Sequence, residues 1–222
     1  MKSAERTPYD HFLGSVRKLF SQLRYNGSVM PDGFRESVSD HTAFALWLAD
    51  ISLAEHPTLE RIAGRLQVLD CILYHDIGEI NGDTSIAEQL ANHIDQKKRR
   101  EHERSMVYHI IDRLPSNRSQ ERVLTGYLRY ENAPHTKDLA GLYGHFFDTV
   151  AGAYPVQVNS ERTSTNYQSQ LYVLTQKLHP YTSMITEQLL QLPDPGERAA
   201  AVNEHLGLYA SFSGLFSTLY GE

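Results

Sequence analysis

The chain has 222 residues, of which 41% are hydrophobic and 22% are charged, so it can bury a full core within one domain. Its formal net charge is -6 and it has no long basic run. This argues against binding a nucleic-acid polymer, because such binding relies on Lys and Arg displacing counterions. The sequence has no run of about 18 apolar residues, so no helix is expected to cross a membrane.

The first predicted helix covers residues 9 to 25 and closes at Arg24, because apolar side chains recur there at helical spacing. The residues before it lack the apolar segment of a signal peptide. After a loop, Ser37 and Asp40 resemble a capping box that starts a second helix. His41 then lies on its buried face, where a lone histidine is more often a hydrogen-bonded core residue than a ligand. The rest of this face is Phe44, Leu48 and Ile51.

A third helix is predicted over residues 58 to 76 by an apolar stripe, and His75-Asp76 stands at its end. Glycines at 78 and 82 predict a tight turn after it. Cys71, the only cysteine, is interpreted as a small buried residue; it allows no intrachain disulfide and fits a reducing cytoplasm. The stripe consists of Leu59, Ile62, Leu66, Leu69 and Leu73.

The rest of the chain continues the helical pattern. A second capping box, from Ser85 to Glu88, precedes a helix whose charged face, residues 97 to 104, is interpreted as solvated surface. Pro134 is expected to separate two later helices. The absence of sustained alternation predicts an all-α fold, a single domain over residues 1–222. The later helices are expected over about 94–114, 117–131, 136–153, 167–189 and from 197 onwards.

Asp148 shares a side of its predicted helix with glycines at 141, 144 and 152. Glycine costs a helix interior about 1 kcal/mol relative to alanine, so these positions require a reason. Either they leave room for something to approach Asp148, or they allow two helices to cross closely. The sequence leaves both interpretations open.

The stretch from Leu73 to Asp83 contains a histidine and three carboxylates. Such groups repel or desolvate one another when crowded, and a divalent metal ion is the usual remedy. Together with His41 and Asp148, the pair His75-Asp76 resembles the H…HD…D pattern of the HD-domain superfamily of metal-dependent phosphohydrolases. The phrases 36–41 and 75–83 resemble most closely the branch that contains 5′-deoxynucleotidases. The resemblance covers about residues 10–155, which would form a helical-bundle core, with a C-terminal helical extension over about 156–222.

This resemblance implies one divalent ion held by His41, His75, Asp76 and Asp148, with Mn²⁺, Co²⁺, Zn²⁺ or Fe²⁺ favoured over Mg²⁺ because two ligands are imidazoles. It also implies catalytic roles for Glu79 and Asp83. By the same resemblance Arg24 binds the substrate phosphate, and Arg35 is a rival for that role.

The leading hypothesis is a phosphomonoesterase that attacks (deoxy)nucleoside 5′-monophosphates with a metal-activated water. A (deoxy)nucleoside triphosphohydrolase, or a hydrolase of another small phosphate ester or diester, is the second hypothesis. The third is a helical protein with a structural metal site, for which Glu79 and Asp83 would be unnecessary. The apolar, tyrosine-rich stripes of the last two helices are expected both to complete the core and to form a homodimer face.

Overall fold

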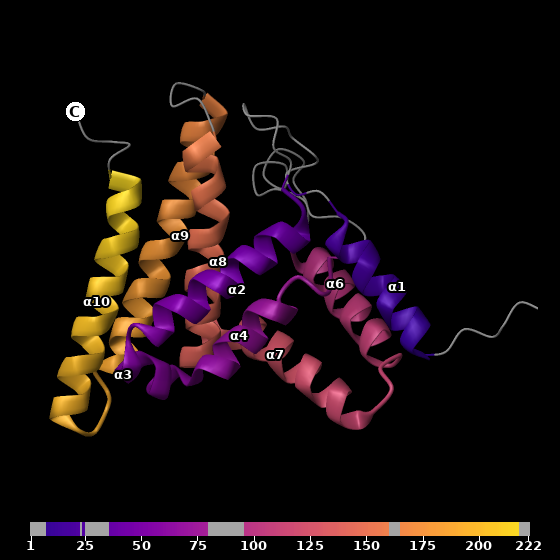
Figure 1. The fold of residues 1–222 in the computed structure, drawn as a ribbon, viewed down its shortest axis with the longest axis horizontal. Coiled ribbons are helices and arrows are strands. Elements are labelled where there is room, and N and C mark those ends of the chain that lie inside the picture. Colours follow the sequence, from indigo (N-terminus) through magenta and orange to yellow (C-terminus); the bar gives the residue numbers. More distant parts are fainter. Residues whose placement is uncertain (1–7, 23, 25–35, 80–95, 160–164, 218–222) are drawn as a thin grey trace, which may run out of the picture.

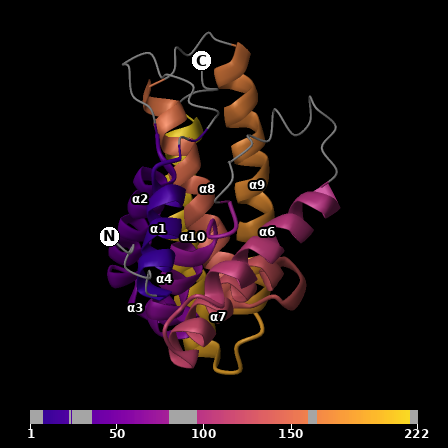
Figure 2. The same ribbon diagram turned by 90° about the vertical axis from the view of Figure 1, so that its right-hand side faces the viewer.

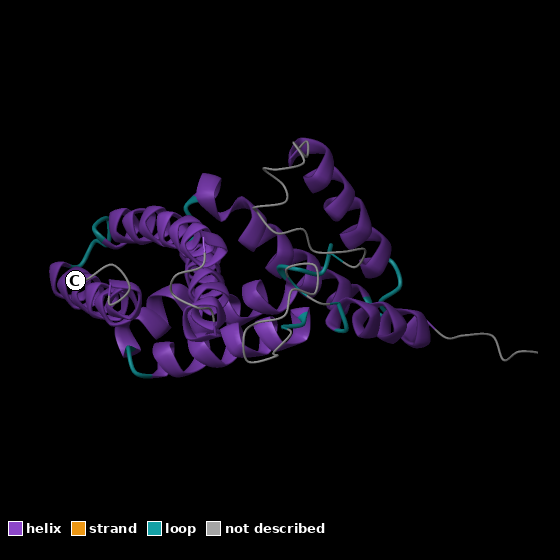
Figure 3. Ribbon diagram, turned by 90° about the horizontal axis from the view of Figure 1, so that it is seen from above, coloured by secondary structure: helices purple, strands orange, loops and turns teal. Residues whose placement is uncertain are grey.

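The computed structural model describes residues 8–22, 24, 36–79, 96–159 and 165–217. Within these ranges the regular elements are helices and no β-strand occurs, which confirms the all-α prediction (Figure 3). None of the described helices combines the length and the apolar character needed to cross a bilayer. The second capping box, Ser85 to Glu88, lies outside the described residues.

Helix α1 (Pro8–Phe20) ends earlier than predicted. After it, the Val38 amide donates to the Gln22 carbonyl and the Arg24 amide donates to the Glu36 carbonyl, each at 2.8 Å. The prediction that the helix closes at Arg24 is therefore wrong, because the Gln22 carbonyl and the Arg24 amide bond to Val38 and Glu36 instead of continuing the helix. This pairing holds Arg24 beside the start of α2 (Val38–Ala54).

The capping box at the start of α2 is confirmed. The Ser37 hydroxyl accepts from the Asp40 amide at 3.1 Å, and an Asp40 carboxylate oxygen accepts from the Ser37 amide at 2.9 Å. His41 is fully buried as predicted, but Ile51 is 45% exposed. The buried face is narrower and is made largely of small residues, which allow α2 to pack closely on its neighbours α4 and α8. This face consists of Val38, His41, Thr42, Ala45, Ala49, Ser52 and Leu53.

The single helix predicted over residues 58 to 76 is divided into α3 (Pro57–Leu59), the π-helical turn η2 (Glu60–Gly64) and α4 (Arg65–Tyr74). Gly64 has a φ of 72°, which lies outside the right-handed helical region. The apolar stripe is consequently out of phase after this point. Leu66 is 74% exposed, whereas Val68, Cys71 and Ile72 enter the core. The prediction that Cys71 is buried is confirmed, and burial raises the pKa of its thiol to about 12.

Helix α6 (Gln96–Ile111) is followed by α7 (Asn117–Thr136) and α8 (Leu139–Asn159). Pro134 lies inside α7, so the predicted break there is wrong. The helix ends instead at Thr136, and its C-cap Lys137 has a left-handed backbone with a φ of 59°. A Cβ at Gly141 would collide with the Arg129 carbonyl of α7, and a Cβ at Gly144 would lie 3.1 Å from the Cys71 Cβ of α4. These two glycines therefore serve close helix crossings.

Helices α9 (Thr165–Leu189) and α10 (Pro195–Ser217) complete the described structure. Helix α9 packs along α8, and α10 packs against α9 and α3 (Figure 1). The buried imidazole of His205 on α10 lies 3.1 Å from the Tyr143 hydroxyl of α8 and 3.3 Å from the Thr182 carbonyl of α9. One core cluster lies among α2, α4, α8, α9 and α10, and a second lies among α1, α6 and α7. Figure 2 shows α7 crossing the lower end of the upright helices.

Candidate metal centre

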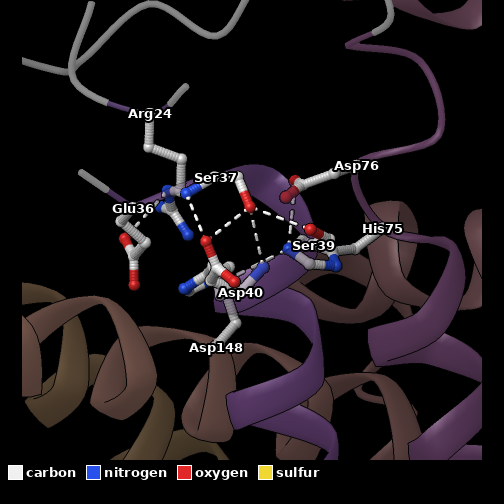
Figure 4. Close-up of polar contacts among 9 residues, drawn as sticks. Arg24, Glu36, Ser37, Ser39, Asp40, His75, Asp76 and Asp148 are labelled. Atoms are coloured by element: carbon white, nitrogen blue, oxygen red, sulfur yellow. Dashed lines mark hydrogen bonds and ion pairs between the residues drawn. The ribbon is translucent and has the colours of Figure 1, made fainter. Parts of the chain in front are cut away.

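Three side chains from separate helices meet at one point. His41 comes from α2, His75 stands at the C-terminal end of α4, and Asp148 comes from α8. Asp148 Oδ1 lies 2.7 Å from His41 Nε2 and 3.3 Å from His75 Nε2. Figure 4 shows His75, Asp76 and Asp148 directed toward the same region, with Arg24 and Glu36 to one side. The mutual packing of α2, α4 and α8 creates this meeting point.

The spacing of these atoms suits a shared cation. One ligand atom from each of His41, His75 and Asp148 lies within 4.8 Å of the other two. Ligands at about 2.0–2.2 Å from an ion are about 2.8–3.1 Å from one another in octahedral geometry and about 3.3–3.6 Å in tetrahedral geometry. The two observed separations, 2.7 and 3.3 Å, lie close to these values. Imidazole nitrogen and carboxylate oxygen are ligands that suit Mn²⁺, Co²⁺, Zn²⁺ and Fe²⁺.

The His75 ring is oriented by its own helix. Its Nδ1 lies 2.6 Å from the Ile72 carbonyl, to which it donates when Nε2 is unprotonated. A backbone acceptor at one imidazole nitrogen commonly directs the other toward a metal. Within the described part of the chain, the buried His41 Nδ1 has no such acceptor. His41 is therefore positioned through packing and its Nε2 contact.

The charges of the three groups are interdependent. Burial lowers the pKa of His41 to about 4, assisted by the nearby Arg24 guanidinium, so this imidazole is neutral near pH 7. Burial also opposes charge on His75, but the Asp76 and Asp148 carboxylates outweigh it and raise the His75 pKa well above its ordinary value. In turn, His75 and His41 overcome burial and hold the Asp148 pKa well below its usual range. A positive charge is therefore stabilised where the three side chains meet.

Asp76, the fourth predicted ligand, lies next to His75. Its Oδ1 is 3.0 Å from His75 Nε2, but it is outside the group of three whose ligand atoms all lie within 4.8 Å of one another. Although burial opposes ionisation, His75 and Arg24 lower the pKa of Asp76. Asp76 is thus an anionic neighbour of the cluster.

The other predicted site residues have different surroundings. Arg24 Nε lies 3.6 Å from a buried Glu36 carboxylate, and its guanidinium affects the pKa values of His41 and Asp76. The Glu79 amide donates to the Asp76 carbonyl at 2.8 Å, which places Glu79 in the turn directly after α4. Asp83 and Arg35 lie outside the described residues.

Tyr130 contacts two of the predicted ligands, although no sequence pattern singles it out. Its hydroxyl donates to Asp148 Oδ2 at 2.7 Å, and its ring lies 5.1 Å from that of His75. Burial and the Asp148 carboxylate raise the Tyr130 pKa well above its ordinary value, so the hydroxyl keeps its proton. The sequence contains one relevant signal. Pro134 follows four residues later and cannot donate to the Tyr130 carbonyl, so this carbonyl lacks its usual helical donor.

Two comparisons with known proteins give matches. The family model described as "HD domain" matches residues 16–172, a range that includes all four predicted ligands. Among solved structures, the chain is similar to a "predicted metal-dependent phosphohydrolase" from Magnetospirillum magnetotacticum MS-1, with 18% identity and a TM-score of 0.57, over 92% of this chain and 93% of that chain. At that identity the likeness establishes the fold alone. The comparison with curated proteins gives no match.

Proposed function

This chain belongs to the HD-domain family, and from that premise we propose that it is a metal-dependent phosphohydrolase. The observation that carries the proposal is the meeting of His41, His75 and Asp148 within 4.8 Å of one another. These residues come from helices that are distant in the sequence, and their charges favour a cation between them. The description of the similar Magnetospirillum protein agrees with this activity.

In the proposed site, His41 and His75 supply nitrogen ligands and Asp148 supplies Oδ1, with Asp76 as the fourth protein ligand. A bound divalent ion lowers the pKa of a coordinated water and neutralises charge on phosphoryl oxygens. His41 suits this role because its low pKa of about 4 leaves the imidazole neutral, with a lone pair to share. The two carboxylates together balance the charge of a divalent ion.

The remaining site residues would bind the substrate and accept the proton of the attacking water. Glu79, in the turn after α4, would accept the proton of the attacking water, since a positioned carboxylate is a common general base. Asp83 would support the same step. Arg24 would orient the substrate phosphate, because its planar guanidinium donates two parallel hydrogen bonds to phosphate oxygens.

We further propose that the substrate is a (deoxy)nucleoside 5′-monophosphate. The support is the resemblance of residues 36–41 and 75–83 to the 5′-deoxynucleotidase-like branch. A (deoxy)nucleoside triphosphate or another small phosphate ester or diester is the second candidate. The third candidate is a purely structural metal site, which would require no role for Glu79.

Phosphate release measured with malachite green tests the proposal. Metal-stripped protein would be assayed against nucleoside and deoxynucleoside monophosphates and triphosphates, without metal and then with Mn²⁺ or Co²⁺. Metal-dependent release from monophosphates is expected, and Asp148→Asn would abolish it. Pyrophosphate or triphosphate as product, which malachite green does not detect and anion-exchange chromatography would identify, would favour the second candidate. No product from any substrate with any metal would favour the structural site.

A further inference from the structure

The two oxygens of Asp148 have separate partners. Oδ1 faces both imidazoles, 2.7 Å from His41 Nε2 and 3.3 Å from His75 Nε2. Oδ2 instead accepts a 2.7 Å hydrogen bond from the Tyr130 hydroxyl of α7. Oδ1 is therefore the oxygen that faces the two imidazoles, whereas Oδ2 faces the phenol.

Tyr130 is fixed at its backbone as well. Pro134 has no N–H, so it cannot make the helical hydrogen bond to the Tyr130 carbonyl that another residue at this position would make. That carbonyl lies 2.9 Å from His145 Nε2, which donates to it. His145 and Asp148 are one turn apart on α8, so the two polar ends of Tyr130 are bonded to the same side of that helix.

Ring packing extends this arrangement to α9. The rings of Tyr130 and His145 have centroids 3.7 Å apart, and the His145 ring stacks on Tyr181 of α9 at 4.6 Å with an interplanar angle of 4°. Burial lowers the pKa of His145 to about 4, so its imidazole is neutral near pH 7 and Nε2 can keep the proton it donates. Residues 130, 145 and 181 thus form a packed column beside the proposed metal ligands.

We propose that Tyr130 is a positioning residue that holds Asp148 as a ligand through Oδ1 alone. The proposal rests on the metal centre described under the proposed function. A carboxylate free to rotate can bind an ion through one oxygen or two, and a hydrogen bond to one oxygen selects the first mode. Oriented ligands leave coordination positions open for water and substrate, as a catalytic site requires.

Co²⁺ titration of metal-free protein tests this inference, because the visible absorption of Co²⁺ reports its coordination number as well as its affinity. Tyr130→Phe removes the hydroxyl and keeps the ring against His75 and His145. Tyr143→Phe is the matched control, since it also removes a buried hydroxyl, which contacts His205 instead of a proposed ligand. Far-UV circular dichroism checks that both variants remain helical.

We expect Tyr130→Phe to weaken Co²⁺ binding by about 10- to 100-fold, the usual effect of losing a hydrogen bond to a ligand. Its absorption should also become weaker as the coordination number rises. Tyr143→Phe should retain the wild-type affinity and spectrum. Wild-type behaviour of Tyr130→Phe, or equal weakening by both variants, would overturn the positioning role and leave the proposed function intact. Failure of the wild-type protein to bind Co²⁺ would overturn both.

A second measurement does not require a variant. In wild-type protein loaded with Zn²⁺, the Tyr130 hydroxyl proton should exchange slowly with water by NMR, because Asp148 Oδ2 still accepts it. Rapid exchange after loading would contradict the inference.

Discussion

His41 Nε2 and Asp148 Oδ1 lie 2.7 Å apart although 107 residues separate them in the chain. The contact results from helix packing, since α2 and α8 lie directly against each other and both side chains project from helical backbone. A capping box starts α2 one turn before His41, which fixes where that helix begins. The proposed ligands are thus placed by rigid elements, as a preorganised metal site requires.

Replacing His75 or Asp76 by alanine should abolish turnover while leaving the helical content unchanged. Each change removes a proposed ligand. Co²⁺ affinity should therefore fall by more than the decrease of about 10- to 100-fold that follows loss of a residue hydrogen-bonded to a ligand. Activity, Co²⁺ titration and circular dichroism measure the three properties. His102→Ala, at an exposed position on α6, should behave as wild type. Retained activity in both ligand variants would refute the assignment.

Glu79→Gln should separate metal binding from chemistry. We expect turnover to fall by about 10²–10⁴-fold, the usual effect of losing a general acid or base, because an amide cannot accept the proton. Co²⁺ affinity should be unchanged, since Glu79 is not a proposed ligand. Glu121→Gln, on the exposed side of α7, is the control. Undiminished turnover in Glu79→Gln would exclude the catalytic role.

Arg24→Ala should raise KM for the phosphate ester more than it lowers kcat. A hydrogen bond to a charged group contributes about 1.5–3 kcal/mol, which corresponds to about a 10- to 150-fold change in KM. Arg24→Lys should restore part of the effect, because it keeps the charge but loses the planar fork. Arg17→Ala, exposed on α1, should leave KM unchanged. An unchanged KM in Arg24→Ala would show that another group binds the phosphate.

Acid should destabilise the fold in part through His205. Burial lowers the pKa of this imidazole to about 4. In the unfolded chain it gains a proton near its ordinary pKa of about 6.5, so the unfolded state binds more protons between about pH 6.5 and about pH 4. Stability therefore rises with pH across this window, and His205 alone accounts for a change of about 3 kcal/mol.

Urea unfolding at several pH values would measure this effect. His205→Gln keeps a donor for the Thr182 carbonyl and an acceptor for the Tyr143 hydroxyl, but does not titrate. The variant should lose less stability than the wild-type protein on going from about pH 7 to about pH 4. Identical pH dependence of the two proteins would contradict the expected change at His205.

Local signals in the sequence predicted local structure well. The capping box depends on Ser37 and Asp40 alone, and it is present as expected. The sequence does not predict the change of phase at Gly64, because Leu59, Ile62 and Leu66 have the spacing of an uninterrupted helix. The turn becomes visible only in the folded backbone.

In the candidate site, too, local sequence indicates some residues, whereas only the fold reveals others. Resemblance in two short phrases and one downstream aspartate indicated His41, His75, Asp76 and Asp148, and the fold brings three of them together. The sequence alone does not indicate Tyr130, because the hydroxyl partner of this residue is fixed by the crossing of α7 and α8. The role of the glycines at 141 and 144 depends on helix crossings for the same reason.

The most direct test of the central claim is a crystal structure of the Co²⁺-loaded protein, with data collected at the cobalt absorption edge. We predict one anomalous peak between His41 Nε2, His75 Nε2 and Asp148 Oδ1, at about 2.0–2.2 Å from each atom. An anomalous map with no peak between these three atoms, or with cobalt bound only elsewhere, would contradict the account.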